Sequence, residues 1–157
     1  MNGNDSPRPA KKKIHSVTVN VFVRATEDES KVLTAFRLIV PENLLIKRQP
    51  VTGHFGNSII ILKARTEQIQ AIRLIIHAIV NKLSRRDLTR LREQIPQHLS
   101  ERCTLVVKFD KQAAARGVLE LGEDDPIVVR AKIAAYPARP SIAAEIARDV
   151  LNNAYIY

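Results

Sequence analysis

The strongest constraint on the fold is a turn at residues 52–57, where the sequence reads Thr-Gly-His-Phe-Gly-Asn. On either side of it, residues 44–51 and 58–65 read as extended segments. Gly53, Gly56 and Asn57 supply backbone positions with positive φ, which short hairpin turns require. The sequence therefore predicts a β-hairpin. An antiparallel pair of strands excludes a purely parallel sheet.

Three further strands are predicted by the alternation of apolar and polar residues, over residues 14–25, 103–109 and 127–135. In the first of them, every second residue from Val17 to Val23 is valine. Successive side chains of a strand point to opposite faces, so one face of this strand is expected to be buried.

Helices are predicted where apolar residues recur at helical spacing between recognisable end signals. The first follows a capping box formed by Thr26 and Glu29, and ends at Pro41. The longest falls within residues 66–83. The next is shorter and is expected to run from a cap formed by Ser84 and Asp87 to a stop at Pro96.

Two more helices are predicted in the last third of the chain. Asp110 is placed to cap a short helix over residues 111–116, and Ser141 to cap a final helix after a proline-bracketed linker. The final helix has an apolar stripe of small residues. This stripe either covers the domain's own core or joins two chains, so a monomer and a homodimer both remain open.

The resulting order is β-α-β-β-α-α-β-α-β-α. It indicates an α+β fold with a mostly antiparallel sheet and helices packed on one face. Three regions are expected. Residues 1–13 form a disordered basic tail, residues 14–136 form the α+β domain, and residues 137–157 form a linker and the C-terminal helix.

Positive charge is concentrated in two parts of the chain. The formal net charge is +9. Residues 1–13 carry +3, and residues 47–102 carry +7 from eleven basic and four acidic side chains. A basic middle on a nearly neutral body is typical of a protein that binds a polyanion. The alternative is a charge surplus that serves only solubility.

Several classes of chemistry have no support in the sequence. Cys103 is the only cysteine, which rules out an intramolecular disulfide and favours a reducing, cytoplasmic location. The four histidines show no zinc spacing, and no phosphate-binding glycine loop is present. We therefore expect no cofactor, no metal and no catalytic activity. The apolar runs are too short to span a membrane, so no membrane partner is expected.

An enzyme remains the competing interpretation. A magnesium-dependent ribonuclease needs only a few carboxylates, and Asp28, Asp110 and the acidic cluster at residues 123–125 are the candidates.

The predicted turn is the first candidate binding site. His54 and Phe55 lie at its tip, next to Asn57 and between basic side chains on both flanking segments. An aromatic ring among cations can stack on an unpaired base while the cations hold phosphates. The alternative is that Phe55 folds back onto the core.

Two other segments are candidates. Arg85, Arg86, Arg90 and Arg92 are spaced so that several of them share a helix face, unless the helix is merely solvated and they pair with Asp87 and Glu93. Lys111 and Gln112 follow a strand at the start of a helix, where a phosphate can bind. The alternative at this second segment is capping alone.

Three motifs occur in a recognisable order. Residues 23–29 read Val-Arg-Ala-Thr-Glu-Asp-Glu, the His-Phe-Gly-Asn turn runs into Ile59–Arg65, and Leu105–Phe109 is followed by Asp-Lys-Gln-Ala-Ala. Together, over roughly residues 14–135, they resemble the archaeal RNA-binding proteins described as predicted exosome subunits. The resemblance implies a fold similar to ribosomal protein L5. It also implies RNA as a partner, a role in RNA processing or degradation, and exosome proteins as possible partners.

The combined interpretation is a non-catalytic RNA-binding protein. A scaffold that binds exosome proteins without touching RNA is a third alternative. The residues predicted to contact RNA are Arg24, Lys47, Arg48, His54, Phe55, Asn57, Lys63, Arg65, Arg85, Arg86, Arg90, Lys111 and Gln112.

Overall fold

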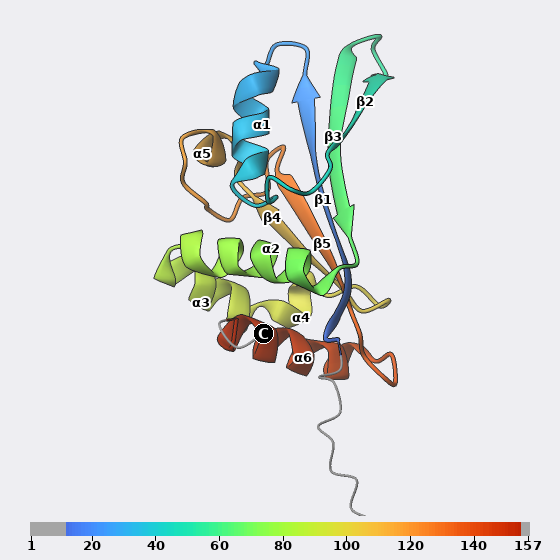
Figure 1. Ribbon diagram of the computed structural model, residues 1–157, viewed down its shortest axis with the longest axis vertical. Helices are drawn as coiled ribbons and strands as arrows, with labels where there is room; N and C mark the ends of the chain where they lie inside the picture. The colour runs from blue at the N-terminus through green and yellow to red at the C-terminus, as the bar shows by residue number, and fades with distance from the viewer. Residues whose placement is uncertain (1–11, 155–157) are drawn as a thin grey trace, which may run out of the picture.

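A computed structural model describes residues 12–154 and shows five strands and six helices in these residues (Figure 1). The predictions for the first eleven residues of the tail lie outside this range. The strands are β1 (Ile14–Arg24), β2 (Lys47–Thr52), β3 (Ser58–Thr66), β4 (Thr104–Phe109) and β5 (Ile127–Ile133). The helices are α1 (Glu29–Arg37), α2 (Ile69–Lys82), α3 (Arg85–Glu93), α4 (Ile95–His98), α5 (Lys111–Ala115) and α6 (Pro140–Asn152).

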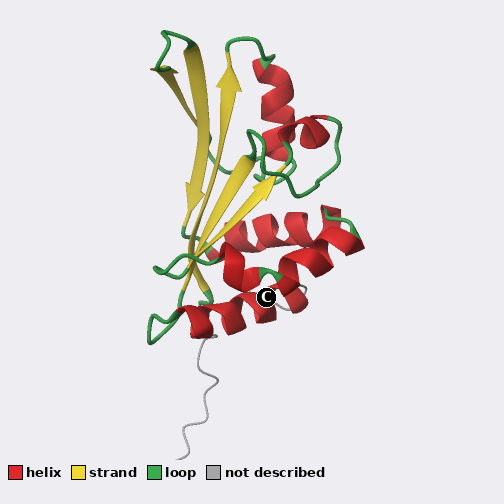
Figure 2. Ribbon diagram, turned by 180° about the vertical axis from the view of Figure 1, so that it is seen from behind, coloured by secondary structure: helices red, strands yellow, loops and turns green. Residues whose placement is uncertain are grey.

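The strands form one sheet in the order β2-β3-β1-β5-β4, and every neighbouring pair is antiparallel. The predicted hairpin is confirmed as β2 and β3, and β1 occupies the centre of the sheet. The α+β fold class is therefore confirmed. All the helices lie on the same side of the sheet, as Figures 1 and 2 show from opposite directions.

This one-sided cover divides the residues of each strand into two sets. On β1, Val17, Val19, Val21 and Val23 are buried beneath the helices, as the alternation predicted. The residues between them point to the other face, which no described helix covers. We call this second surface the open face. Burying the valines contributes roughly 2 kcal/mol each, so the register of β1 is firmly specified.

Four local predictions need correction, and the first two concern helix caps. Asp28, not Thr26, caps α1, because its carboxylate accepts the Ser30 amide at 2.9 Å. The N-cap of α6 is Arg139 rather than Ser141, and the rigid Pro140 begins the helix.

In the turn, among its glycine and asparagine positions, only Gly56 has positive φ. Gly53 instead donates its amide to the Asn57 carbonyl at 2.7 Å. The proline at position 96 lies in the first turn of α4, a helix that was not predicted.

The apolar stripe of α6 covers the core of its own chain. Ala143, Ala147 and Val150 are buried there, and Arg92 Nη2 on α3 donates to the Leu151 carbonyl at 3.0 Å. This is the first of the two predicted alternatives for the stripe. Within residues 12–154, no helix is both long and apolar enough to cross a lipid bilayer.

Candidate nucleic-acid interface

The open face is strongly cationic. The five strands contain eight lysine and arginine residues and no aspartate or glutamate. Strand alternation and register place seven of the eight on the open face, with Arg48 as the exception. The seven are Arg24, Lys47, Lys63, Arg65, Lys108, Arg130 and Lys132. Such a concentration of one sign of charge attracts a polyanion.

Two of these cations lie directly across from each other. Lys47 on the edge strand β2 is the register partner of Lys63 on β3, and both side chains are exposed. Neither forms an ion pair with any of the residues that the structure describes. Like charges directly opposite on a sheet are destabilising. An anion bound between the two ammonium groups would remove this repulsion.

The two lysines border a groove of about 460 Å³. Leu45, Gln49, Ile61 and Arg65 form the rest of its lining. Leu45 is 78% exposed and gives this lining an apolar side chain that faces solvent. Apolar and cationic groups therefore alternate within one groove, as a nucleotide with its apolar base and anionic phosphate requires.

The other cations of the open face have partners within the protein. Arg65 Nη2 lies 2.8 Å from Glu67, whose pKa it lowers by hydrogen bonding and charge. Arg130 Nη1 donates to Asn20 Oδ1 at 2.7 Å, and Lys108 lies 3.4 Å from a carboxylate of the β4–β5 connection. Surface pairs of this kind contribute little to stability. A phosphate can therefore replace the carboxylate at small cost.

One aromatic ring lies among these cations. Phe22 is on the open face of β1, and its side chain is 41% exposed. Its register partner on β3 is Ile61, which lines the groove. Asn20 and Arg24 precede and follow it on the same face of the strand. The ring therefore borders the groove and has polar and charged neighbours along β1.

Buried ion pairs fix the end of β1 beside this ring. Lys111 is 3% exposed, and its ammonium donates to the Phe22 carbonyl at 3.0 Å and to Glu27 at 2.8 Å. It also pairs with Asp125, which binds Arg24 through Nε and Nη2 at 3.0 and 3.1 Å. The Asp125 pKa is lowered. Burial is the largest single effect and raises the pKa, but the hydrogen bonds and positive charges of Arg24 and Lys111 together outweigh burial.

This arrangement changes the interpretation of the Asp-Lys-Gln motif. The Lys111 ammonium is occupied by carboxylates, so it is not available as the predicted phosphate contact. The Asp110 carboxylate accepts the Ala113 amide at 2.7 Å and thereby occupies the start of α5. At this segment the structure therefore shows helix capping by Asp110, which was the alternative to a phosphate site. Gln112 is exposed and borders a separate small pocket beside α1.

The turn presents its two rings to solvent. Phe55 is 86% exposed, so the alternative in which it packs into the core is wrong. The His54 and Phe55 rings meet edge to face, with centroids 5.0 Å apart. Asn57 is also exposed at this tip. The tip lies at the far end of the hairpin that carries Lys47 and Lys63, as Figure 1 shows.

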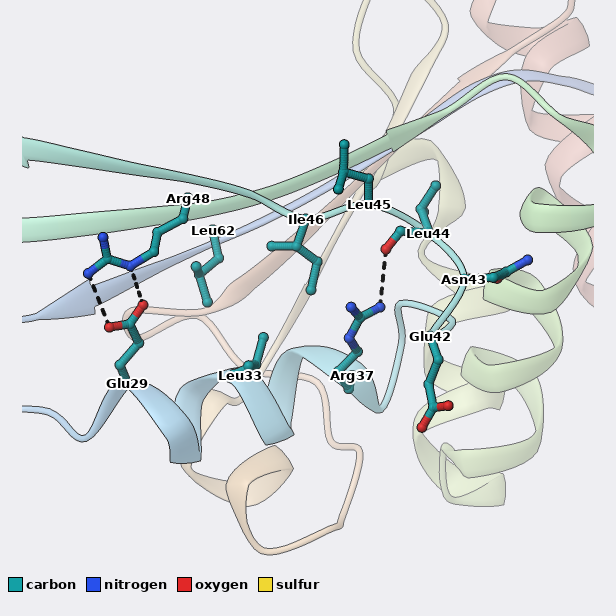
Figure 3. A pocket seen from close by; sticks show the side chains of 10 residues that line it. All are labelled: Glu29, Leu33, Arg37, Glu42, Asn43, Leu44, Leu45, Ile46, Arg48 and Leu62. Carbon is teal, nitrogen blue, oxygen red and sulfur yellow. Dashed lines mark hydrogen bonds and ion pairs between the residues drawn. The ribbon is translucent and has the colours of Figure 1, made fainter.

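Arg48 does not belong to the open face. It points toward α1 and forms a two-point ion pair with Glu29, with Nε 2.5 Å from Oε1 (Figure 3). This pair closes one end of a second pocket, of about 450 Å³. Leu33, Ile46 and Leu62 give that pocket an apolar lining between α1 and β2. The sheet therefore separates the Arg48 side chain from those of Lys47 and Lys63.

The α3 arginines form a separate basic surface. Arg85, Arg86 and Arg90 are exposed, and none forms an ion pair with a described residue. The alternative of pairing with Asp87 or Glu93 is therefore not observed. Figures 1 and 2 place α3 in the helical layer, far from the hairpin tip. The structure thus does not join these arginines to the residues of the hairpin.

The carboxylates proposed for a ribonuclease have other roles. The carboxylates of Asp28 and Asp110 cap helices, and Asp125 pairs with two cations. Within residues 12–154, no three His, Cys, Asp or Glu side chains are grouped as a metal site requires.

Three basic residues of the open face were not predicted. Lys108, Arg130 and Lys132 come from β4 and β5, which are distant in the sequence from the hairpin. These three residues share a surface with the hairpin only because β1 pairs with β3 of the hairpin on one side and with β5 on the other. One sequence signal was available, because each of the predicted strands carries basic residues and no acidic residue.

Comparison with known proteins shows the family of this chain. The sequence model of a family described as "RNA binding" matches residues 16–133. RNA-binding protein PAB1135 of Pyrococcus abyssi is 31% identical over 143 residues, covering 87% of this chain and 93% of that protein.

Solved structures from archaea are also similar. Protein AF2318 from Archaeoglobus fulgidus has a TM-score of 0.79 at 27% identity, and covers 88% of this chain and 99% of its own. Mth689 from Methanothermobacter thermautotrophicus has a TM-score of 0.73 at 30% identity, and covers 89% of this chain and 99% of its own. Both are described as members of DUF54. The family match spans most of the chain, and the chain therefore belongs to this RNA-binding family.

Proposed function

We propose that this protein binds RNA on the open face of its sheet, without cutting it, and that the Lys47–Lys63 groove is the centre of the interface. One observation carries the proposal. Two exposed lysines are held directly opposite each other with no carboxylate partner among the described residues. Folding alone gains nothing from this arrangement, whereas a bridging phosphate gains two charge-assisted contacts.

The other residues of the proposed interface are assigned to it because they lie on the open face or at the tip of the hairpin. Arg65 lines the same groove, and Arg24, Lys108, Arg130 and Lys132 extend the positive surface across the sheet. His54, Phe55 and Asn57 add an exposed tip at which RNA leaving the groove is contacted.

The proposal is tested by removing the two unpartnered charges. We expect Lys47→Gln/Lys63→Gln to weaken RNA binding by tenfold or more, because each lost phosphate contact also removes counterion release. The melting temperature should stay equal or rise, since a repulsive pair is removed. The affinity is measured by fluorescence anisotropy with labelled RNA.

A matched control separates local contacts from total charge. Lys31→Gln/Arg116→Gln removes the same charge from two exposed residues on the helical side. We expect this variant to bind RNA nearly as tightly as the unchanged protein. Equal losses in both variants would mean that net charge, rather than the open face, determines affinity.

Non-catalytic binding is proposed because the candidate carboxylates are used as caps and ion-pair partners. Labelled RNA incubated with the protein and Mg²⁺ should stay intact to the same extent as in EDTA. Cleavage that depends on Mg²⁺ would restore the ribonuclease interpretation.

An association with the exosome in RNA processing or degradation, and the similarity to ribosomal protein L5, rest on the motifs that resemble that protein group. The apolar pocket beside α1 in Figure 3 is a surface outside the proposed RNA site that a protein partner can contact. Exosome proteins should co-purify after nuclease treatment if the association is direct.

A further inference from the structure

The open face carries a feature that phosphate binding alone does not explain. A purely electrostatic surface needs cations, yet the ring of Phe22 lies exposed in the middle of this one. Exposing an aromatic ring to water forgoes hydrophobic stabilisation. The other residues on the open face of this part of β1, Thr18, Asn20 and Arg24, are polar or charged, so a polar residue at position 22 would fit the pattern of the strand equally well.

The surroundings of the ring show how a base would be held. Phe22 pairs in register with Ile61, and Ile61 also lines the groove that Lys47 and Lys63 border. An apolar platform of two side chains therefore adjoins a pair of unpartnered cations on one surface. When a base stacks on the Phe22–Ile61 platform, the phosphates of the same nucleotide lie close to Lys47 and Lys63.

The platform is also held in position from below. The buried Lys111 ammonium binds the Phe22 carbonyl, and Asp125 holds the Arg24 guanidinium two residues further along the strand. These contacts fix the backbone on which the ring is mounted and keep a cation beside it. A rigid platform loses little conformational entropy when a ligand binds.

We infer that the RNA bound by this face is single-stranded and that one of its bases stacks on the ring of Phe22. The inference rests on the proposed function and specifies its ligand. A duplex pairs and stacks its bases internally and is recognised mainly through its shape, its phosphates and its 2′-hydroxyls. Such a ligand gives an exposed ring no role. Single strands are instead bound by aromatic stacking combined with cations along the backbone.

The first part of the test compares two RNA forms. A labelled oligonucleotide of about ten nucleotides with no self-pairing is titrated beside a duplex of the same length, and affinity is measured by fluorescence anisotropy. We expect the single strand to bind at least tenfold more tightly. Equal or tighter binding of the duplex would overturn the inference.

The second part changes only the ring. Phe22→Leu keeps an apolar side chain but removes the flat face, and it should weaken single-strand binding about tenfold. Duplex binding should not change. Phe22→Tyr keeps the face and should retain affinity for the single strand. Because the position is exposed, both variants should fold, which melting temperatures check.

The outcomes distinguish this inference from the proposal on which it rests. If Lys47→Gln/Lys63→Gln weakens binding but Phe22→Leu binds the single strand like the unchanged protein, RNA binding on the open face stands and stacking on Phe22 is wrong. If the lysine variant has no effect, the proposed function itself fails. An acidic protein that competes for the face while RNA does not bind would contradict both.

Discussion

At the scale of single residues, the direction of a side chain decides its role more than its identity does. Lys47 and Arg48 are neighbours in the sequence and have the same charge, but strand alternation sends them to opposite faces. Lys47 is left unpartnered on the open face, whereas Arg48 is paired with Glu29. From the sequence, both residues were predicted to contact RNA. The sequence does not show which face of the sheet the helices cover, so it could not tell which of the two side chains lies on the open face.

Lys111 gives the sharpest residue-scale prediction. It is a buried cation with two carboxylate partners, Glu27 and Asp125, which themselves retain partial exposure. Lys111→Met leaves both carboxylates without this partner, and we expect a loss of about 3 kcal/mol in the free energy of unfolding. Urea denaturation measures this loss. Lys31→Met, an exposed substitution on α1, should change stability by less than 1 kcal/mol.

The same experiment separates the two interpretations of Lys111. A phosphate contact would be exposed, and its removal would lower RNA affinity without lowering stability. A substantial loss of stability in Lys111→Met, with none in Lys31→Met, supports the buried ion-pair cluster. Unchanged stability combined with weakened RNA binding would contradict it.

At the scale of elements, local patterns predicted what each segment forms but not how the segments are arranged. The β2–β3 hairpin, β1 and the long helix α2 follow from periodicity and turn residues that act within a few positions. The order of strands in the sheet depends on long-range packing. That order places β5 beside β1 and β4 beside β5, on the same sheet as the hairpin, which is why the basic residues of β4 and β5 were missed.

Capping was predicted correctly for α3 and α5, but not for α6, where Pro140 begins the helix, nor for α1, where several acceptors compete. Ser84 and Asp110 cap their helices as predicted, through bonds to the third following amide. Before α1, however, the sequence offers a run of acceptors from Thr26 to Glu29. The Glu27 carboxylate accepts hydrogen bonds from the Arg24 amide and the Lys111 ammonium. The next residue, Asp28, caps the helix instead.

The separate position of α3 leads to a prediction at this scale. Its exposed arginines lie in the helical layer, so an RNA confined to the open face cannot reach them. We expect Arg85→Gln/Arg86→Gln/Arg90→Gln to leave binding of an oligonucleotide of about eight nucleotides unchanged, since single platforms cover about 4–16. Binding of an RNA of about 60 nucleotides should weaken severalfold.

Gel-shift titrations with the two RNAs measure this difference. Lys47→Gln/Lys63→Gln serves as the comparison, because it should weaken binding of both lengths. If the arginine variant loses affinity for the short RNA as strongly as for the long one, α3 belongs to the primary RNA site and is not a separate basic surface.

At the scale of the whole molecule, the charge is distributed according to the layers. The sheet layer carries its cations mainly on the open face, and the fifteen acidic residues within residues 12–154 all lie outside the strands, in helices and loops. Several of them pair with cations at the ends of strands, as Asp125 and Glu67 do. The net charge of +9 therefore understates the positive potential that an approaching RNA meets on the open face.

The salt dependence of binding tests this distribution. If the open face contacts four to six phosphates of a single strand, the logarithm of the association constant should fall with the logarithm of salt concentration with a slope of about −3 to −4. Lys47→Gln/Lys63→Gln removes about two contacts and should make the slope shallower by about 1.4. Lys31→Gln/Arg116→Gln has the same net charge and should keep the original slope, because its lost charges face away from the RNA. Affinities measured between about 50 and 300 mM KCl give all three slopes. A flat response in the unchanged protein would show that binding is not electrostatic, and equal slopes in the two variants would assign the effect to net charge instead of to the open face.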